Sequence, residues 1–287
     1  MESPLTGTVM QWGRWSMDFS ERPLIMGVIN VTPDSFSDGG DFLSSERAIE
    51  QGIRLAEEGA DILDLGGEST RPGAEEVGAT EELARVIPVI EALTARTSVP
   101  ISIDTYKAEV AEASVGAGAA IINDISAGLL DPEILRVAAR LDVPLVLMHM
   151  KGQPRTMQEN PEYDDLMGEI KAFLADAARR AEAAGVRADR IILDPGIGFG
   201  KTFDHNLILL NRLREFQELG RPILLGPSRK AFLGRILGGA PPKDRDVATA
   251  AAVTLGAYNG AAILRVHNVD LARQVLAVTA AVLREHA

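Results

Sequence analysis

The chain contains no cysteine among its 287 residues, which excludes a disulfide framework, a thiolate nucleophile and a Cys-based zinc site. It also lacks an excess of positive charge, because 29 Lys and Arg face 41 Asp and Glu for a formal net charge of -12. Proteins that bind nucleic acid or an anionic membrane without sequence preference usually carry basic patches. We therefore expect no nucleic-acid partner and no membrane partner.

Long apolar runs are missing as well. No run approaches the roughly 20 residues that a membrane-spanning helix needs. The first 20 residues carry Glu2, Arg14 and Asp18 and lack the continuous apolar core of a signal peptide. A hydrophobic fraction of 46% with 24% charged residues is ordinary for a globular protein. We expect a cytoplasmic protein that is neither membrane-spanning nor disordered.

Short apolar runs of β type alternate with longer helical segments from about residue 24 onward. The eight runs lie at 24–30, 61–65, 100–103, 119–122, 144–148, 190–194, 222–225 and 261–266. Most are continuous rather than alternating, which is typical of parallel strands covered by helices. The pattern predicts a (β/α)8 TIM barrel that occupies residues 22–287 as a single domain. A doubly wound open sheet is the alternative, and periodicity does not exclude it.

The first 21 residues are predicted to form an N-terminal cap, a hairpin turning at Gly13. Helix starts are indicated by capping residues. Ser44 and Ser45 precede the first apolar helical stripe, and Asn268 and Asp270 precede the last one.

Polar side chains directly follow several of the apolar runs. Asp104 and Asn123 come directly after the third and fourth runs, Asp194 ends the sixth, and Met148 ends the fifth. Ligands of parallel α/β folds bind at the carboxyl ends of strands. Such acid and amide groups can recognise the donor and acceptor edge of a flat heterocycle. Asp104 can instead cap the next helix, and Met148 can either lie under an aromatic ring or be simple core.

Positive charge follows the last two runs. Ser228, Arg229 and Lys230 come after the seventh run, and Arg265 and His267 lie at the end of the eighth. Many barrels hold phosphate there, so we expect an anion at this side of the mouth. His267 taken alone can also be a structural histidine, and the sequence leaves the same two interpretations open for His149. The four histidines are too scattered for a zinc cluster.

Seven motifs together resemble the dihydropteroate synthase family. They are NVTPDSFSDGG (30–40), GGESTRPG (66–73), SIDT (102–105), IINDISAG (121–128), DPGIGFGK (194–201), GPSRK (226–230) and RVHNV (265–269). They occur in order at seven strand ends, and the resemblance covers about residues 24–284.

The resemblance implies a transferase of folate biosynthesis, the target of sulfonamides. It condenses 6-hydroxymethyl-7,8-dihydropterin diphosphate with 4-aminobenzoate to give 7,8-dihydropteroate and diphosphate. Carried over by motif, the pterin-binding residues are Asp104, Asn123, Met148, Asp194, Phe199 and Lys230. The diphosphate would be held by Asn30, Thr70, Arg265, Val266 and His267, with Mg2+ on Asn30. The 4-aminobenzoate pocket would use Thr70, Pro72, Phe199, Ser228 and Ala231. Phe36, Thr70 and Arg71 would close over the site, where Asp104 and Lys230 also act in catalysis.

One position departs from the family pattern. Many members carry a serine after the lysine of SRK, and this chain has Ala231, which removes a hydroxyl contact to the aminobenzoate carboxylate. A pterin-dependent methyltransferase shares the barrel and is the alternative enzyme, and a non-catalytic pterin-binding homologue is the other alternative. A homodimer is usual in the family. The Ala- and Val-rich helices at 247–257 and 271–283 are candidates for its interface, unless they only pack on the barrel.

Overall fold

The computed structural model describes residues 9–31, 40–69, 76–152 and 156–285. Within them, eight parallel strands form one sheet at the centre of the molecule, each at the position of one predicted run. They are β3 (Leu24–Asn30), β4 (Ile62–Gly66), β5 (Ile101–Asp104), β6 (Ile121–Asp124), β7 (Leu145–Met148), β8 (Ile191–Asp194), β9 (Leu224–Leu225) and β10 (Ile263–Val266).

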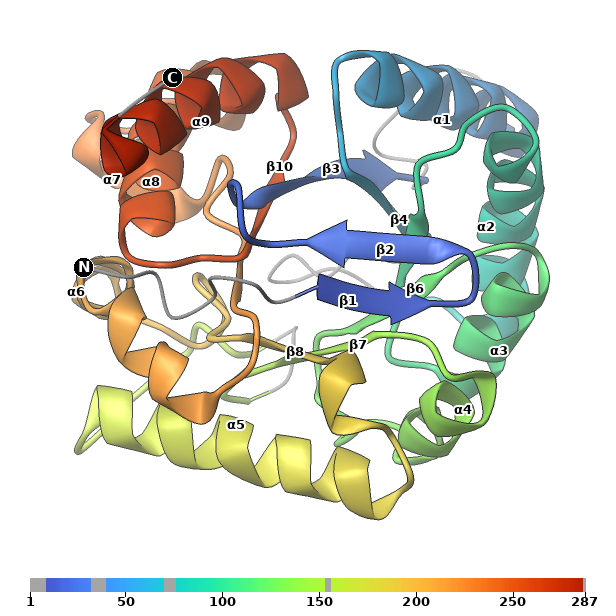
Figure 1. Cartoon of the computed structure of the whole chain (residues 1–287), viewed down its shortest axis with the longest axis horizontal. Helices are drawn as coiled ribbons and strands as arrows, with labels where there is room; N and C mark the ends of the chain where they lie inside the picture. Colours follow the sequence, from blue (N-terminus) through green and yellow to red (C-terminus); the bar gives the residue numbers. More distant parts are fainter. Residues whose placement is uncertain (1–8, 32–39, 70–75, 153–155, 286–287) are drawn as a thin grey trace.

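The strands pair in the order β8-β7-β6-β5-β4-β3-β10-β9. A parallel bridge between Leu193 and Ile223 then joins β8 to the residues just before β9, so the sheet curls into a barrel. Figure 1 shows the helices surrounding the strands. The predicted TIM barrel is therefore confirmed, and the open-sheet alternative is wrong.

The helices follow the strands along the chain. They are α1 (Gly40–Glu57), α2 (Ala79–Thr94), α3 (Ala108–Gly116), α4 (Glu133–Leu141), α5 (Leu166–Ala183), α6 (Phe203–Asn211), α7 (Ala231–Ile236), α8 (Asp246–Tyr258) and α9 (Val269–Arg284), with short 3-10 turns η2 (Ala188–Arg190), η3 (Leu213–Leu219) and η4 (Pro242–Asp244). Asn268 caps α9 as predicted, its side chain accepting from Leu271 N at 3.1 Å. The prediction for α1 was wrong at its start, because the helix begins at Gly40 rather than after Ser45.

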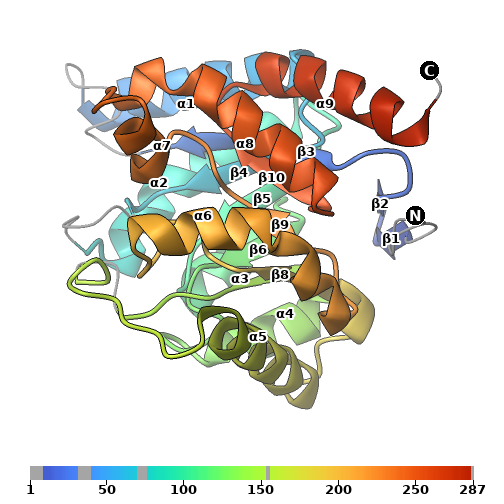
Figure 2. The same ribbon diagram turned by 90° about the vertical axis from the view of Figure 1, so that its left-hand side faces the viewer.

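The N-terminal hairpin consists of β1 (Val9–Trp12) and β2 (Trp15–Asp18), which pair antiparallel around a turn in which Gly13 has a φ of 48°. Trp12 is buried, and its Nε1 donates to Ala120 O at 2.8 Å, just before β6 begins. The hairpin therefore covers the amino ends of the barrel strands. Figure 2 shows it at one end of the barrel.

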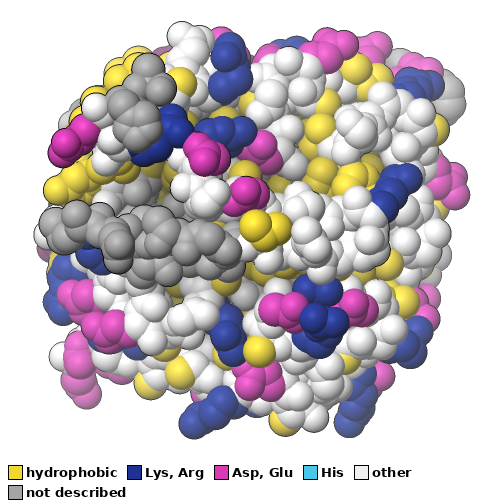
Figure 3. Space-filling view, viewed as in Figure 1, with side chains coloured by type: hydrophobic (Ala, Val, Ile, Leu, Met, Phe, Trp, Pro, Cys, Tyr) yellow, Lys and Arg dark blue, Asp and Glu magenta, His cyan; other side chains and the backbone are white. Residues whose placement is uncertain are grey.

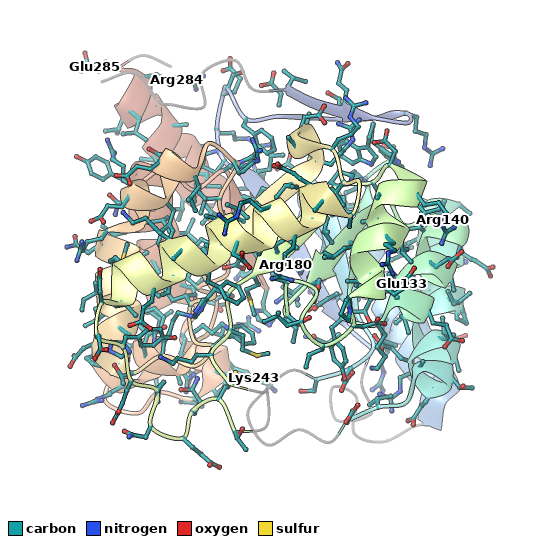
Figure 4. The ribbon with its side chains drawn as sticks, turned by 90° about the horizontal axis from the view of Figure 1, so that it is seen from below. Glu133, Arg140, Arg180, Lys243, Arg284 and Glu285 are labelled. Atoms are coloured by element: carbon teal, nitrogen blue, oxygen red, sulfur yellow. The ribbon has the colours of Figure 1, made fainter. Side chains whose placement is uncertain are left out.

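Buried side chains of the strands fill the barrel and its contacts with the helices. Ile25, Met26, Ile62, Leu63 and Ile103 are each 0% exposed. Helices also support the loops at the carboxyl ends of the strands. In the view of Figure 4, Arg180 reaches from α5 and donates to Ala127 O at 3.0 Å, in the loop after β6.

The face seen in Figure 3 carries Lys and Arg interspersed with Asp and Glu. Within the part of the chain that the structure describes, no helix is long and apolar enough to cross a membrane.

Candidate functional site

The carboxyl ends of the strands surround one cavity. It contains seven of the predicted site residues and three apolar or glycine neighbours: Asp104, Asn123, Met148, Asp194, Phe199, Lys230 and Arg265, with Ile125, Ile197 and Gly226. The strand order explains the cluster, because β5, β6, β7 and β8 are consecutive neighbours in the sheet. Residues that are far apart in the sequence therefore end at the same edge of the barrel.

The carboxylates of Asp104 and Asp194 line the cavity and are largely shielded from water. Burial raises the pKa of Asp104 to about 7, opposed by the charge of Arg265 and assisted by that of Asp64. Burial also raises the pKa of Asp194 to about 6, opposed by the hydrogen bond that Gly196 N donates to its Oδ1 at 2.7 Å. Buried carboxylates of this kind gain most from a ligand that donates hydrogen bonds to them.

Arg265, which lines the cavity, bridges the carboxylates of Asp64 and Asp104. Its Nε donates to Asp64 Oδ2 at 2.6 Å, and its Nη2 donates to Asp104 Oδ2 at 2.7 Å. Burial alone would lower the pKa of Arg265, but the charges of Asp64 and Asp104 raise it above its ordinary value. The guanidinium is therefore a permanent cation beside the predicted pterin-binding residues.

The loop after β8 forms a second wall. Gly196 has a φ of 68°, and a Cβ there would overlap the carbonyl oxygen of His149, so only glycine fits. Lys201 is buried beneath the loop and donates to Phe199 O at 2.9 Å, and its Nζ lies 2.9 Å from His149 Nδ1. Burial lowers the pKa of Lys201 to about 7. His149 therefore contacts Lys201 beneath this loop through both its ring and its carbonyl oxygen.

Phe199, in the loop after β8, lines the cavity. The Nζ of Lys230 lies 4.0 Å from the centre of the Phe199 ring, within the range of a cation–π contact. Lys230 and Phe199 therefore form one flank of the cavity together.

The residues predicted for diphosphate and aminobenzoate lie around the last strands. Ser228 Oγ is 2.9 Å from His267 Nδ1, and His267 N donates to the same oxygen at 3.2 Å. Val266 is buried at the end of β10, and Asn30 ends β3. Ala231 is exposed at the first position of α7.

Arg229 does not share the position of Lys230, although the sequence grouped both as anion-binding charge. Its Nε and Nη2 donate to the two oxygens of Asp246 at 2.7 and 3.0 Å, and its backbone N donates to Thr249 Oγ1 at 3.0 Å. Asp246, at the start of α8, takes both arms of the Arg229 guanidinium, whereas Lys230 lines the cavity.

Four predicted residues lie outside the described residues: Phe36, Thr70, Arg71 and Pro72. The structure does describe the residues on either side of 70–75, the stretch that contains Thr70, Arg71 and Pro72. Glu68 Oε1 accepts from Val77 N at 3.2 Å, and Glu68 Oε2 accepts from Lys107 Nζ at 2.5 Å. Glu68 therefore links the two sides of the GGESTRPG loop to the start of α3.

Sequence reasoning missed Asp64, which is 0% exposed in β4. Its carboxylate accepts from Arg265 and from Asn123 Nδ2, the latter at 3.2 Å to Oδ2. A signal was available, because an Asp within an otherwise continuous apolar run must find a partner when it is buried.

A barrel whose carboxyl-end cavity combines buried carboxylates, an amide and cations around apolar walls defines an enzyme-type ligand site. The chain belongs to the pterin binding enzyme family, whose sequence model matches residues 26–267.

Individual relatives agree with this assignment. The chain is 47% identical over 281 residues to dihydropteroate synthase of Synechocystis sp., covering 98% of this chain and 95% of that protein. It is also similar to the structure of Yersinia pestis dihydropteroate synthase in a sulfonamide drug complex, with a TM-score of 0.91, 44% identity and coverage of 96% and 99%. The structure of Xanthomonas albilineans dihydropteroate synthase with 4-aminobenzoic acid matches with a TM-score of 0.88, 49% identity and coverage of 93% and 95%.

Proposed function

We propose that this chain is a transferase that makes 7,8-dihydropteroate and diphosphate from 6-hydroxymethyl-7,8-dihydropterin diphosphate and 4-aminobenzoate. The observation that carries the proposal is the convergence of Asp104, Asn123, Asp194, Lys230 and Arg265 on one cavity. Similarity to dihydropteroate synthases over nearly the full chain supports the same reaction.

The buried end of the cavity has the apolar surface and the hydrogen-bonding groups to bind a pterin. A pterin ring is flat and carries several N–H groups along its edge, and the two carboxylates and the amide oxygen accept hydrogen bonds. Met148 and Phe199 supply apolar surface for the ring faces. Lys230 adds the donor that a carbonyl on the ring requires.

The reaction needs no protein nucleophile. The amine nitrogen of 4-aminobenzoate attacks the methylene carbon of the pterin, the bond from that carbon to the diphosphate oxygen breaks, and the amine loses one proton. Diphosphate leaves with the electron pair of the broken bond. Asp104 and Asp194 stabilise positive charge that develops on the pterin, and Arg265 and His267 stabilise the negative charge on the leaving group.

Asn30 is the residue that fits a role with Mg2+. Its amide oxygen is a hard ligand of the type that Mg2+ prefers, and its side chain makes no hydrogen bond within the described residues. No group of three or more His, Cys, Asp or Glu side chains that could hold a metal occurs in the described part of the chain. This suits Mg2+, which often binds through one or two protein ligands plus substrate phosphates. Bound there, it would neutralise charge on the departing diphosphate.

The aminobenzoate pocket is assigned by motif to the outer part of the site. Ser228 and Phe199 lie beside the proposed diphosphate and pterin residues, and Ala231 begins the next helix. Thr70 and Pro72 would complete this pocket, Thr70 would also contact the diphosphate, and Phe36 and Arg71 would cover the bound substrates.

We also propose that a second copy of the chain covers α8 and α9, which pack against each other as Figure 2 shows. The two helices expose large apolar side chains, namely Val247, Leu255, Tyr258, Val278 and Val282. Contiguous exposed apolar surface favours association. Sedimentation analysis of Val278→Asp, with the exposed Val9→Asp on the hairpin as control, tests this: only the α9 variant should become monomeric, and a monomeric parent protein would contradict it.

The function is tested by diphosphate release. The purified protein should release diphosphate only when the pterin diphosphate, 4-aminobenzoate and Mg2+ are all present, and 7,8-dihydropteroate should appear in equal amount. Methyl transfer to a corrinoid would support the methyltransferase alternative, and pterin binding without turnover would support the non-catalytic one.

A further inference from the structure

Asp64 is a buried charge that no predicted role explains. It lies inside β4 with 0% exposure, between the apolar residues Leu63 and Leu65. Burying a carboxylate is costly unless charge and hydrogen bonds compensate it. In the described part of the chain, the hydrogen bonds to Asp64 come from two residues of the candidate site: Arg265 Nε at 2.6 Å and Asn123 Nδ2 at 3.2 and 3.4 Å.

This contact fixes which way the amide of Asn123 faces. An ionised carboxylate only accepts hydrogen bonds, so the NH2 group of Asn123 must point toward Asp64. The remaining polar atom, Oδ1, then belongs to the cavity that Asn123 lines, and no described residue donates to it. The orientation follows from the chemistry of the pair, although the two amide ends look alike in shape.

The consequence is that one wall of the cavity only accepts hydrogen bonds, whereas Lys230 and Arg265 supply donors elsewhere in the lining. Asp104 Oδ1 is buried and has no partner within the described residues, and Asp194 is a second acceptor. With Asn123 Oδ1 added, these three side chains accept hydrogen bonds. If the amide of Asn123 were reversed, a donor would face the donor edge of the ligand, which disfavours binding.

We propose that Asp64 is a positioning residue: its carboxylate locks the Asn123 amide, so that the pocket presents acceptors to the N–H edge of the pterin. It also holds Arg265 at the end of the same cavity. This inference rests on the proposed function, because it takes a pterin as the ligand.

The test uses isothermal titration with 6-hydroxymethyl-7,8-dihydropterin, which lacks the diphosphate and cannot react. In Asp64→Asn the residue at 64 can donate or accept, so the amide of Asn123 is no longer locked. Pterin affinity should fall about tenfold or more. The KM for 4-aminobenzoate should stay within twofold, because Asp64 contacts no residue assigned to that substrate alone.

The matched control is Asp124→Asn. Asp124 is also 0% exposed and ends β6, but among the described residues its carboxylate accepts only from Ser126 and Gly128, in the loop after that strand. This variant should lower the melting temperature and leave pterin affinity within twofold. Equal loss of pterin affinity in both variants would mean that Asp64 acts only through stability, and would overturn the proposal.

The swapped pair Asp64→Asn with Asn123→Asp supplies the decisive readout. The new amide at 64 donates to the new carboxylate at 123, whose other oxygen again faces the cavity as an acceptor, and the total charge is unchanged. Affinity should recover to within about threefold of the parent protein. No recovery in a folded double variant would overturn the proposal.

A neutron structure of the parent protein tests the amide orientation without any variant. Deuterons on the Asn123 nitrogen that faces Asp64 support the proposal, and deuterons facing the cavity overturn it. The proposed function fails separately, since it fails only if the parent protein itself binds no pterin or does not turn over.

Discussion

The two oxygens of Asp104 have different partners: Oδ2 accepts from Arg265 Nη2 at 2.7 Å, whereas Oδ1 is buried and accepts from no described residue. A buried carboxylate oxygen without a donor carries an energetic cost that a ligand N–H can remove. Under the proposed function, this oxygen of Asp104 is the one that would accept from a pterin N–H and face the positive charge that develops on the ring.

Replacing Asp104 by Asn should lower kcat at saturating substrates by about tenfold to a hundredfold, because one charge-assisted hydrogen bond is lost. Steady-state rates at several times KM for both substrates measure this. An unchanged kcat would show that Asp104 has no electrostatic role in the reaction.

Pterin affinity should fall as pH is lowered from 8 to 6. Burial raises the pKa of Asp104 to about 7 and that of Asp194 to about 6, so both are ionised acceptors at pH 8 and protonate as pH falls through those values. Below each pKa the affinity should decrease by up to about tenfold per pH unit. Titration calorimetry at pH 8, 7 and 6 measures the trend. In Asp104→Asn, the decrease in pterin affinity near pH 7 should be absent. A pterin affinity that does not change with pH in the parent protein would contradict the prediction.

Lys201 should make stability rise with pH above neutrality. Its pKa is lowered from 10.5 to about 7 by burial, so between these values the unfolded chain binds one more proton than the folded one. The free energy of unfolding therefore increases with pH in that window, by up to about 1.4 kcal/mol per unit. Urea unfolding at pH 7.5 and 9.5 measures the slope. Lys201→Met should reduce it, while an equal slope in both proteins would argue against a neutral Lys201.

The same variant should also loosen Phe199, because Lys201 donates to its carbonyl oxygen. An increase of about fivefold in KM for the pterin substrate is expected from losing one hydrogen bond of about 1 kcal/mol. Unchanged kinetics would limit Lys201 to a role in stability.

Ala231→Ser should lower the KM for 4-aminobenzoate. The substitution adds a hydroxyl at the first position of α7, where we propose that the carboxylate of 4-aminobenzoate binds. One added hydrogen bond corresponds to about 1 kcal/mol, or about fivefold. The KM for the pterin substrate is the internal control and should stay the same. An unchanged KM for 4-aminobenzoate would count against the contact.

Trp12→Phe should destabilise the barrel without changing its chemistry. The substitution leaves Ala120 O without the indole donor that it has at 2.8 Å, at a cost of about 1–3 kcal/mol. Chemical unfolding measures the loss, and Trp15→Phe, on the more exposed side of the hairpin, should cost less. A fall in kcat with unchanged stability would be the contrary result.

The fold could be predicted because each barrel strand is a continuous apolar run with a helix after it. The start of α1 could not, since Ser44 and Ser45 are good capping residues yet the helix extends back to Gly40. Local capping preference sets only a weak boundary, which neighbouring structure can move.

The site was partly predictable for the same reason. Asp104, Asn123 and Asp194 are conspicuous because each lies at the end of an apolar run or directly after one. Asp64 was hidden inside such a run, and Arg229 looked equivalent to Lys230 until α8 placed Asp246 against it. Both outcomes depend on contacts between distant segments, which sequence spacing does not encode.

The hairpin end of the barrel has a practical consequence. Arg284, the last residue of α9, pairs with Glu21 at 2.7 Å, just after the hairpin, so the end of α9 lies beside the hairpin, opposite the cavity. Figure 2 shows β1, β2 and the end of α9 on the same side of the barrel. A label attached to the side chain at Val9 or at Arg284 would therefore lie on the far side of the barrel from the substrates. Either position can tether the protein to a surface while the cavity keeps its access to solvent.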